Sequence, residues 1–462
     1  MRKNSSRGDA YEARARELSI AAGHEPDERV GAGNGKRGMP RWCEYRQVAR
    51  DEHVAREAVA AAEVIAKTVM PQPPEYIDSP LAVFGEQDDN TIAQMRNCMK
   101  VGNVVGGALC ADAHLGYAQP VGAVVAYEKQ ISISGVGFDI ACGNMAVQLD
   151  VPYDAIKDKI GDIIRDIPKI ISFGVGRVND ERVEHPLFDD TDAWKAADRE
   201  DYKQKAQAQL GTVGSGNHYV DLMRDEGGSA DDGLVWIGVH FGSRGLGHTS
   251  AKKYLTEAGG KDGMNVPPTV VDEDSEIGQR YLAAMDLAGR YAYAGREWVV
   301  ERVRKMIGGT VTDTIHNHHN FAWREKHNGR DLWVVRKGCT PAFPGQRGFI
   351  GGSMGDDAVI VEGTYKPTNE IATASFHSTV HGAGRRFGRK EAIRRFTRDE
   401  MEKWLQERGV HLVGGGVDES PMAYRRLPDV LAAQGESIRV LHTLRPFAVA
   451  MAGEGELDPF KD

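Results

Sequence analysis

Short runs of apolar residues, each bounded by glycine or polar residues, recur through most of the chain. They read VGAVVAY at 121–127, LVWIGVHF at 234–241, LWVVRK at 332–337 and AVIVEG at 358–363. Each run has the length of a β-strand, and its nearly continuous apolar character is typical of a buried strand. The pattern therefore predicts at least four buried strands.

Two longer segments have helical spacing instead. One begins near Ser275 and continues through YLAAMDLAGRYAYAGREWVVERVRKM, and the other covers roughly residues 398–408. Strands and helices are mixed without the regular alternation that a doubly wound sheet requires, and no internal repeat is present. The predicted fold class is therefore α+β.

The first 75 residues differ from the rest of the chain. Residues 1 to about 50 are polar and charged and include GAGNGKRG at 31–38, a composition that predicts a loosely ordered extension. Residues 51–69 carry apolar side chains at helical spacing, which predicts one amphipathic helix. Pro71, Pro73 and Pro74 end that helix because proline cannot continue it. We expect an N-terminal extension over 1–75 and a catalytic domain over 76–462.

Composition narrows the class of protein. Of the 462 residues, 41% are hydrophobic and 27% are charged, as in a soluble globular protein. No apolar run is long enough to cross a bilayer, and the N-terminus lacks the apolar core of a signal peptide. Five cysteines without framework spacing argue against a disulfide scaffold. A cytoplasmic location is therefore expected.

Charge is distributed unevenly. The net charge of −9 does not suggest a non-specific nucleic-acid binder. A basic cluster nevertheless follows His381, and it consists of Arg385, Arg386, Arg389, Lys390, Arg394, Arg395 and Arg398. Such a cluster suits a phosphate-bearing substrate, and it equally suits a solvated helix face.

Four segments, three of them glycine-rich, each carry candidate metal ligands. They are GVGFDIACG with Asp139 and Cys142, GSGNHYVD with His218, VHFGSRG with His240, and HNHHN with His319. A thiolate, imidazoles and a carboxylate suit a divalent transition metal. Taken singly, each residue also fits a structural role. Together they favour one crowded site, or two adjacent sites that share Cys142, with either Zn²⁺ or Mn²⁺.

Two further segments suit an anion. In HGAGR, at 381–385, Gly382 and Gly384 allow a ligand to approach His381 closely. GGSMG, at 351–355, is a candidate turn that presents backbone N–H groups, although it lacks the lysine of a P-loop. Both segments indicate phosphate binding near the candidate metal site.

In this order, the motifs resemble those of the RtcB family of RNA-splicing ligases. The resemblance extends from DAHLG, which begins at residue 112, to the C-terminus. It includes GVGFDIACG, GSGNHYVD, HFGSRGLGH, HNHHNFA, VVRKGCTPAFPG, GGSMG, HGAGR and DESPMAYRRLPDV. It implies the fold of that family, with mixed β-sheets and surrounding helices.

The resemblance also implies a chemistry. Two Mn²⁺ ions would be bound, one by Asp139, Cys142 and His218 and the other by Cys142, His240 and His319. His381 would attack the α-phosphate of GTP and become guanylylated. The guanylyl group would then pass to an RNA 3′-phosphate, formed where necessary from a 2′,3′-cyclic phosphate. A 5′-hydroxyl end would finally displace GMP. Such an RNA ligase serves RNA repair or tRNA splicing.

The resemblance assigns a larger set of residues to the nucleotide. These are Asn217, His218, Tyr219, Val220, Asp221, His319, Asn320, Gly351, Gly352, Ser353, Met354, His381, Gly382, Ala383, Gly384 and Tyr424.

Four positions depart from the family pattern. Asp221 stands where the family usually has glutamate, Ala358 and Gly388 where it has serine, and Met451 where it has lysine. These changes leave open whether GTP is the preferred nucleotide. They also leave two alternatives: a metal-dependent RNA-end phosphodiesterase or nucleotidyl hydrolase that does not ligate, and a non-catalytic protein that binds RNA ends.

Overall fold

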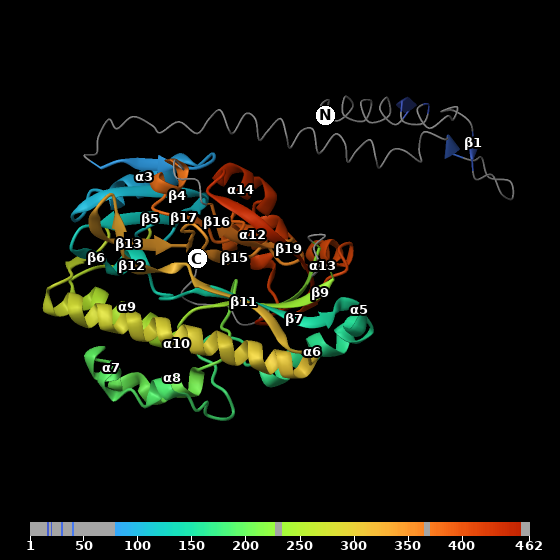
Figure 1. Cartoon of the computed structure of the whole chain (residues 1–462), viewed down its shortest axis with the longest axis horizontal. Helices are drawn as coiled ribbons and strands as arrows, with labels where there is room; N and C mark the ends of the chain where they lie inside the picture. The colour runs from blue at the N-terminus through green and yellow to red at the C-terminus, as the bar shows by residue number, and fades with distance from the viewer. Residues whose placement is uncertain are drawn as a thin grey trace. The chain divides into compact units, whose positions relative to one another are not determined.

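The computed structural model describes residues 79–226, 233–364 and 370–453, with a few positions before residue 79 (Figure 1). By its internal contacts the chain divides into two compact units, Met1–Thr68 and Val69–Asp462. In the first unit, β1 (Arg29–Val30) pairs antiparallel with β2 (Met39–Pro40). The predicted helix over 51–69, its proline stop and the predicted boundary at residue 75 lie outside the described residues and stay predictions.

The larger sheet of the second unit has eight strands. In spatial order they are β11 (Val311–His318), β7 (Gly143–Pro152), β9 (Leu234–Phe241), β8 (Tyr219–Asp225), β19 (Ile438–Met451), β16 (Ala358–Gly363) and β15 (Arg347–Ile350), with β18 (His411–Val413) also paired to β19. Only the β18–β19 pair is parallel. His240 pairs with both Asn144 and Tyr219, so one edge of this sheet holds the start of β7, the end of β9 and the start of β8.

The second sheet has five strands. They are β12 (Asn320–His327), β13 (Arg330–Lys337), β5 (Val121–Tyr127), β4 (Val104–His114) and β3 (Leu81–Val83). Two smaller pairs join β10 (Val270–Asp272) to β6 (Gln130–Ser132) and β14 (Cys339–Pro341) to β17 (Ser378–Val380). All four predicted strands are confirmed as β5, β9, β13 and β16, and only β13 begins earlier than expected.

Helices cover the sheets. They are α3 (Asp89–Cys98), α4 (Ile133–Val136), α5 (Tyr153–Ile156), α6 (Ile160–Ile170), α7 (Thr191–Ala196), α8 (Lys203–Gln209), α9 (Arg244–Glu257), α10 (Glu276–Ile307), α11 (Glu370–Ala374), α12 (Arg389–Arg395), α13 (Arg398–Gln406) and α14 (Leu427–Gln434). Short 3₁₀ turns lie at Lys157–Lys159, Pro186–Phe188, Glu200–Tyr202, Val417–Glu419 and Pro421–Ala423.

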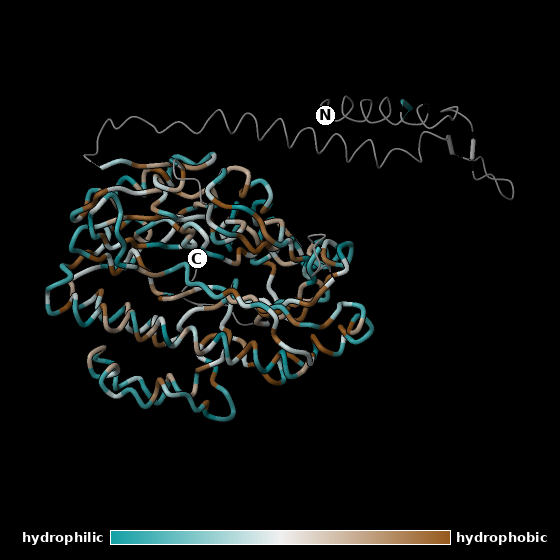
Figure 2. Tube along the Cα trace, viewed as in Figure 1, coloured by the Kyte–Doolittle hydropathy of each residue, from teal (hydrophilic) through white to brown (hydrophobic). Residues whose placement is uncertain are grey.

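The longest helix, α10, is the one predicted to begin near Ser275. The Ser275 side chain accepts a hydrogen bond from the Gly278 N–H and so caps the helix. Apolar residues are interleaved with polar ones along α10 (Figure 2), as expected for a helix with one face against a sheet. It extends along one face of the second unit, with α7 and α8 on its other side (Figure 1). The helix predicted over 398–408 is confirmed as α13 and ends two residues earlier.

Alternation along the strands divides the core between the two faces of the large sheet. Val147 and Ile237 pack in a cluster that includes side chains of α6 and α10. Their neighbours Ala146 and Trp236 point to the opposite face and pack with Phe349. Mixed sheets surrounded by helices confirm the α+β class. Among the described residues, no helix combines the length and the apolar character needed to cross a membrane.

Candidate metal centre and nucleophile

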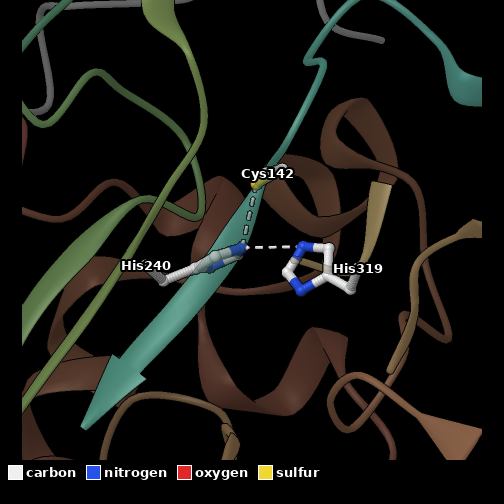
Figure 3. Close-up of side chains that lie close together, drawn as sticks. All are labelled: Cys142, His240 and His319. Atoms are coloured by element: carbon white, nitrogen blue, oxygen red, sulfur yellow. Dashed lines mark hydrogen bonds between the residues drawn. The ribbon is translucent and has the colours of Figure 1, made fainter. Parts of the chain in front are cut away.

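Three side chains from different strands meet at the edge where β7 begins and β9 ends. Cys142 directly precedes β7, His240 is the penultimate residue of β9, and His319 lies between β11 and β12 (Figure 3). His240 Nε2 lies 3.2 Å from Cys142 Sγ and 3.3 Å from His319 Nε2. All three residues are buried. Their three donor atoms therefore face one small volume.

A second group shares the same thiol. His218 Nε2 lies 3.0 Å from Asp139 Oδ2 and 3.7 Å from Cys142 Sγ. In each of the two groups, the candidate ligand atoms lie within 4.8 Å of one another. Sulfur, imidazole nitrogen and carboxylate oxygen together suit a divalent transition metal. The structure thus brings together all five residues that the sequence nominated as ligands, in two groups joined by Cys142.

Two glycines make this convergence sterically possible. A Cβ atom on Gly242 would lie 2.2 Å from Asp139 Oδ1, and one on Gly143 would lie 2.2 Å from the Asn317 carbonyl oxygen. The Cys142 carbonyl accepts hydrogen bonds from the N–H groups of His319, at 2.8 Å, and Asn320, at 3.2 Å. The backbone itself therefore fixes the distance between these ligand-bearing segments.

Burial keeps the His240 and His319 imidazoles neutral. It lowers the pKa of His240 well below its usual value, and the His218 and His381 imidazoles nearby lower that pKa further. Burial also lowers the pKa of His319, with His381 and His240 adding to the effect. His240 Nδ1 lies 3.0 Å from the Asn217 carbonyl oxygen, to which it donates, so the lone pair of Nε2 faces the cluster.

The HNHHN segment separates its histidines by role. His319 joins the metal-ligand cluster, whereas His316 and His318 lie 2.9 Å from nitrogens of the Arg296 guanidinium. His316 and His318 are two residues apart in β11 and therefore lie on the same face of the strand, whereas His319 lies beyond its end. The geometry agrees with the choice of His319, not His316, as the candidate ligand.

The His381 side chain lies beside this cluster. Its ring centroid is 4.9 Å from that of His319, and its Nδ1 lies 2.7 Å from Asp112 Oδ2. The same carboxylate oxygen accepts hydrogen bonds from the backbone N–H groups of His381, at 3.0 Å, and Gly382, at 3.3 Å. His381 Nδ1–H therefore donates to Asp112, which leaves the lone pair on Nε2.

Sequence reasoning used Asp112 only to mark the start of the DAHLG motif. The residue is fully buried in β4, within an otherwise apolar run. A buried carboxylate in a strand requires a polar partner, and this was the signal that could have singled it out. Nothing local in the sequence indicated that the partner would be His381, which lies on another strand pair.

Comparison with known proteins decides the family. A family model described as "tRNA-splicing ligase RtcB" matches residues 94–197 and 186–452. The chain belongs to the RtcB family. A relative from Thermococcus kodakarensis, named tRNA-splicing ligase RtcB, is 30% identical over 81% of this chain and 93% of its own length. An Escherichia coli relative, named RNA-splicing ligase RtcB, is 28% identical over 73% of this chain and 88% of its own length. The resemblance read from the motifs is confirmed.

The RtcB segments assigned to a nucleotide adjoin this centre. Gly351 and Gly382 form an isolated parallel bridge, which brings the GGSMG and HGAGR segments together. A Cβ atom on Gly351 would lie 2.5 Å from the Tyr219 hydroxyl oxygen, and the Tyr219 ring lies 5.3 Å from that of His240. The Val220 side chain is buried in the core, and the residue pairs with Val239 of β9 and Ala450 of β19.

Tyr424 lies in a network of charged groups. Its hydroxyl is hydrogen bonded to Glu419 and lies 2.7 Å from Arg385 Nη1. The Glu419 carboxylate pairs with Arg385 at 2.8 Å and with Arg389 at 2.7 Å, and it is only 3% exposed. Burial alone would lower the pKa of the Arg389 guanidinium, but the Glu419 carboxylate raises it above its usual value. We call these four side chains the Glu419 cluster.

The basic run after His381 is thus partly neutralised by its own surroundings. Arg385 and Arg389 belong to the Glu419 cluster, Arg395 pairs with Glu391 at 2.6 Å, and Arg398 pairs with Glu402 at 2.6 Å. Arg386, Lys390 and Arg394 are exposed. Of the two interpretations of this run, the structure supports the solvated helix face for most of its length.

The four departures from the RtcB pattern occupy different environments. Ala358 and Met451 are buried among apolar side chains, where Met451 packs with Met354 and Tyr219. Gly388 is the N-cap residue of α12 and supplies no side-chain cap. Burial raises the pKa of the Asp221 carboxyl well above its usual value, which favours its protonated form. Polar groups usual in the family are thus replaced by apolar or neutral ones.

Proposed function

We propose that this chain is an RNA ligase that joins a 3′-phosphate or 2′,3′-cyclic phosphate end to a 5′-hydroxyl end, using GTP and Mn²⁺. The reaction passes through a covalent His381–guanylate. The relatives named as RNA-splicing ligases, found over most of the chain, support the reaction class. Its natural place is the repair or splicing of RNA.

One observation carries the proposal: His381 is held by Asp112 directly beside the Cys142-centred ligand cluster. The 2.7 Å contact between His381 Nδ1 and Asp112 Oδ2 fixes the tautomer, so Nε2 is available as a nucleophile. An imidazole with no such partner would divide its proton between two nitrogens. The arrangement therefore suits nucleophilic attack more than metal binding by His381.

The steps are those that the family resemblance implies, with His381 Nε2 as the nucleophile. His381 Nε2 attacks the α-phosphorus of GTP, an N–P bond forms, and pyrophosphate leaves. An oxygen of the RNA 3′-phosphate then attacks the guanylyl phosphorus and releases His381. Finally the 5′-hydroxyl attacks the activated 3′-phosphorus, a phosphodiester forms, and GMP leaves. A cyclic phosphate is hydrolysed to the 3′-phosphate beforehand.

The two ligand groups would hold two ions. Asp139, Cys142 and His218 would bind one, and Cys142, His240 and His319 would bind the other. Bound Mn²⁺ would neutralise negative charge on the phosphates and orient them for in-line attack. The buried neutral imidazoles and the shared sulfur fit a transition metal better than Mg²⁺ or Ca²⁺, which prefer oxygen ligands.

Nucleotide binding is proposed for the segments around this centre. The GGSMG and HGAGR backbones would contact phosphate, and Tyr219, Asp221 and Tyr424 lie in segments that the family pattern places near the base and ribose. The loss of polar groups at Ala358 and Met451 predicts weaker discrimination for guanine. Each missing hydrogen bond would weaken binding by about 1–3 kcal/mol.

Labelled nucleotide tests this function directly. Full-length protein is incubated with Mn²⁺ and GTP labelled at the α-phosphate, and an acid-labile protein adduct is sought. The adduct is expected for the parent protein and absent for His381→Ala. His377→Ala is the matched control, because His377 lies four residues away and stacks on Phe343, outside the ligand cluster. A parallel assay with labelled ATP tests the choice of base.

The alternatives predict different results. A phosphodiesterase or nucleotidyl hydrolase would still open or hydrolyse RNA ends or nucleotide while forming no adduct. A non-catalytic binding protein would retain labelled RNA ends without either reaction. Either result would contradict the ligase proposal.

A further inference from the structure

Arg296 is a fully buried charge at the back of the ligand cluster. It lies in α10 and is 0% exposed. Four of its contacts are hydrogen bonds: Nε to His316 Nε2 at 2.9 Å, Nη1 to the carbonyl oxygens of Ala141 at 3.1 Å and Phe241 at 2.6 Å, and Nη2 to His318 Nδ1 at 2.9 Å. None of these four acceptors is a carboxylate.

Each acceptor belongs to a segment that carries a candidate metal ligand. Ala141 precedes Cys142, and Phe241 follows His240. His316 and His318 precede His319 by three residues and one residue. A single side chain from a long, well-packed helix therefore touches all three segments whose donor atoms meet in Figure 3.

The bonds to the two histidines also fix their protons. A guanidinium only donates, so His316 Nε2 and His318 Nδ1 must both accept. His316 then carries its proton on Nδ1, which lies 3.7 Å from a Glu297 carboxylate oxygen. The Tyr293 ring packs 4.2 Å from the His316 ring and 4.0 Å from the His318 ring, measured between centroids. The segment before His319 is therefore held by two side chains of α10.

The charge itself requires an explanation. Burying a guanidinium without an anion is costly, and apolar residues of the same volume usually fill such a position. Burial lowers the pKa of Arg296 to about 10, while Tyr293, Cys142, Asp139 and Glu297 act in the opposite direction. Holding together the segments that carry the candidate ligands would account for a charge in this position.

We propose that Arg296 is a positioning residue for the metal centre, which holds the Cys142, His240 and His319 segments at ligand spacing. The inference rests on the metal-binding part of the proposed function. Arg296 itself touches neither the ions nor the substrate. Its contribution is to preorganise three segments that come from distant parts of the sequence, before any ion binds.

Cobalt binding separates this role from simple core packing. Full-length protein is stripped of metal with a chelator and titrated with Co²⁺, while the thiolate-to-cobalt charge-transfer absorption is recorded. Cys142→Ala identifies the band that belongs to the shared sulfur. Arg296→Met removes the charge, and Arg296→Lys keeps the charge but loses the forked geometry. Thermal unfolding is measured for every variant.

The chain offers a matched control in Arg199. This arginine is 3% exposed and donates to Ser250 Oγ at 2.8 Å and to Asp201, away from the ligand cluster. Arg199→Met and Arg199→Lys report what the loss of a buried arginine does to stability alone.

The expected result is a change in metal binding beyond any change in stability. Replacing a residue that holds a metal ligand in place typically weakens metal affinity about 10- to 100-fold. We expect that loss for Arg296→Met, with a diminished charge-transfer band, and a smaller loss for Arg296→Lys. The two Arg199 variants should bind Co²⁺ like the parent.

Two results would overturn the inference. In one, both Arg296 variants bind Co²⁺ with parental affinity and absorption. In the other, the Arg199 variants lose as much affinity as the Arg296 variants. If Arg296→Met does not fold, Arg296→Lys alone decides. Absence of the band in the parent protein is a different outcome, because it would refute the metal centre itself and with it the proposed function.

Discussion

The ligand cluster lies beside His381, the first residue of the HGAGR segment, and the Glu419 cluster includes Arg385, its last residue. The two clusters are stabilised in different ways. The ligand cluster is built on neutral imidazoles whose positions are fixed by backbone hydrogen bonds and by Arg296. The Glu419 cluster is built on full charges, with Arg385 and Arg389 paired to one buried carboxylate. The first arrangement leaves donor atoms available to bind an ion; the second uses its charges on one another.

The difference indicates that the two clusters have different roles in the RtcB site. In the ligand cluster, the candidate ligand atoms of each group lie within 4.8 Å of one another, a spacing at which they could hold a cation. In the Glu419 cluster, the arginines already have an anionic partner, so they support the segment around Tyr424 and are poorly placed to be the main phosphate contacts. We therefore expect changes in the two clusters to have separable consequences.

The largest effect is expected from Cys142→Ala. The substitution removes the donor atom that both ligand groups share, so metal content and adduct formation should both be lost. That loss should exceed the roughly 10- to 100-fold typical of residues that only position a ligand. Metal analysis and the labelled-GTP assay measure it. Cys98→Ala is the control, because Cys98 is buried outside the cluster, and it should retain both properties.

Asp112→Asn should uncouple the nucleophile from the metals. The amide cannot accept the His381 proton in the same way, so the wrong tautomer is favoured, and the rate of adduct formation should fall by about 10³- to 10⁴-fold. Co²⁺ titration should be unchanged, since Asp112 belongs to neither ligand group. Rapid-quench measurement of the adduct gives the rate. A parental rate would show that Asp112 does not set the tautomer.

Glu419→Gln tests the other side of the comparison. It removes the carboxylate that pairs with the partly buried Arg385 and Arg389, while Asp418 Oδ2 remains 3.5 Å from Arg389 Nε. We expect the free energy of unfolding to fall by about 3 kcal/mol, the lower end for a buried pair that loses one partner. Metal affinity should stay parental. Urea unfolding and Co²⁺ titration measure the two properties. Glu391→Gln is the control, because it breaks only the exposed pair with Arg395 and should cost no more than about 1 kcal/mol. Equal losses in both variants would contradict the contrast.

The smallest effect is the contribution of His114 to the loss of stability at acid pH. Burial lowers the pKa of His114 from 6.5 to about 4. Below pH 6.5 the unfolded chain therefore takes up a proton that the folded chain does not. The contribution of His114 to stability is complete above pH 6.5 and declines towards pH 4, by at most about 1.4 kcal/mol per pH unit. Urea unfolding across this range should show a shallower decline for His114→Asn than for the parent. Identical slopes would refute the assignment.

The sequence was most informative where function and local pattern coincide. Glycine-framed histidines and the Asp139–Cys142 pair marked the ligand cluster, and apolar runs marked β5, β9, β13 and β16. Sequence patterns did not single out Asp112, Arg296 or Glu419 as site residues, although each is buried and charged. Their partners lie on other elements, and a single sequence does not state which distant segments meet. The serine that caps α10 was found because capping is local.

The position of β19 has a consequence for protein synthesis. This strand lies between β8 and β16 in the large sheet, and its Met451 pairs with Tyr219 at the edge of the candidate site. Both neighbouring strands are translated before it, so the sheet stays open along two strand edges until β19 leaves the ribosome. Pairings between segments so far apart in sequence form slowly. The large sheet can therefore be completed only after the chain has been synthesised as far as Met451.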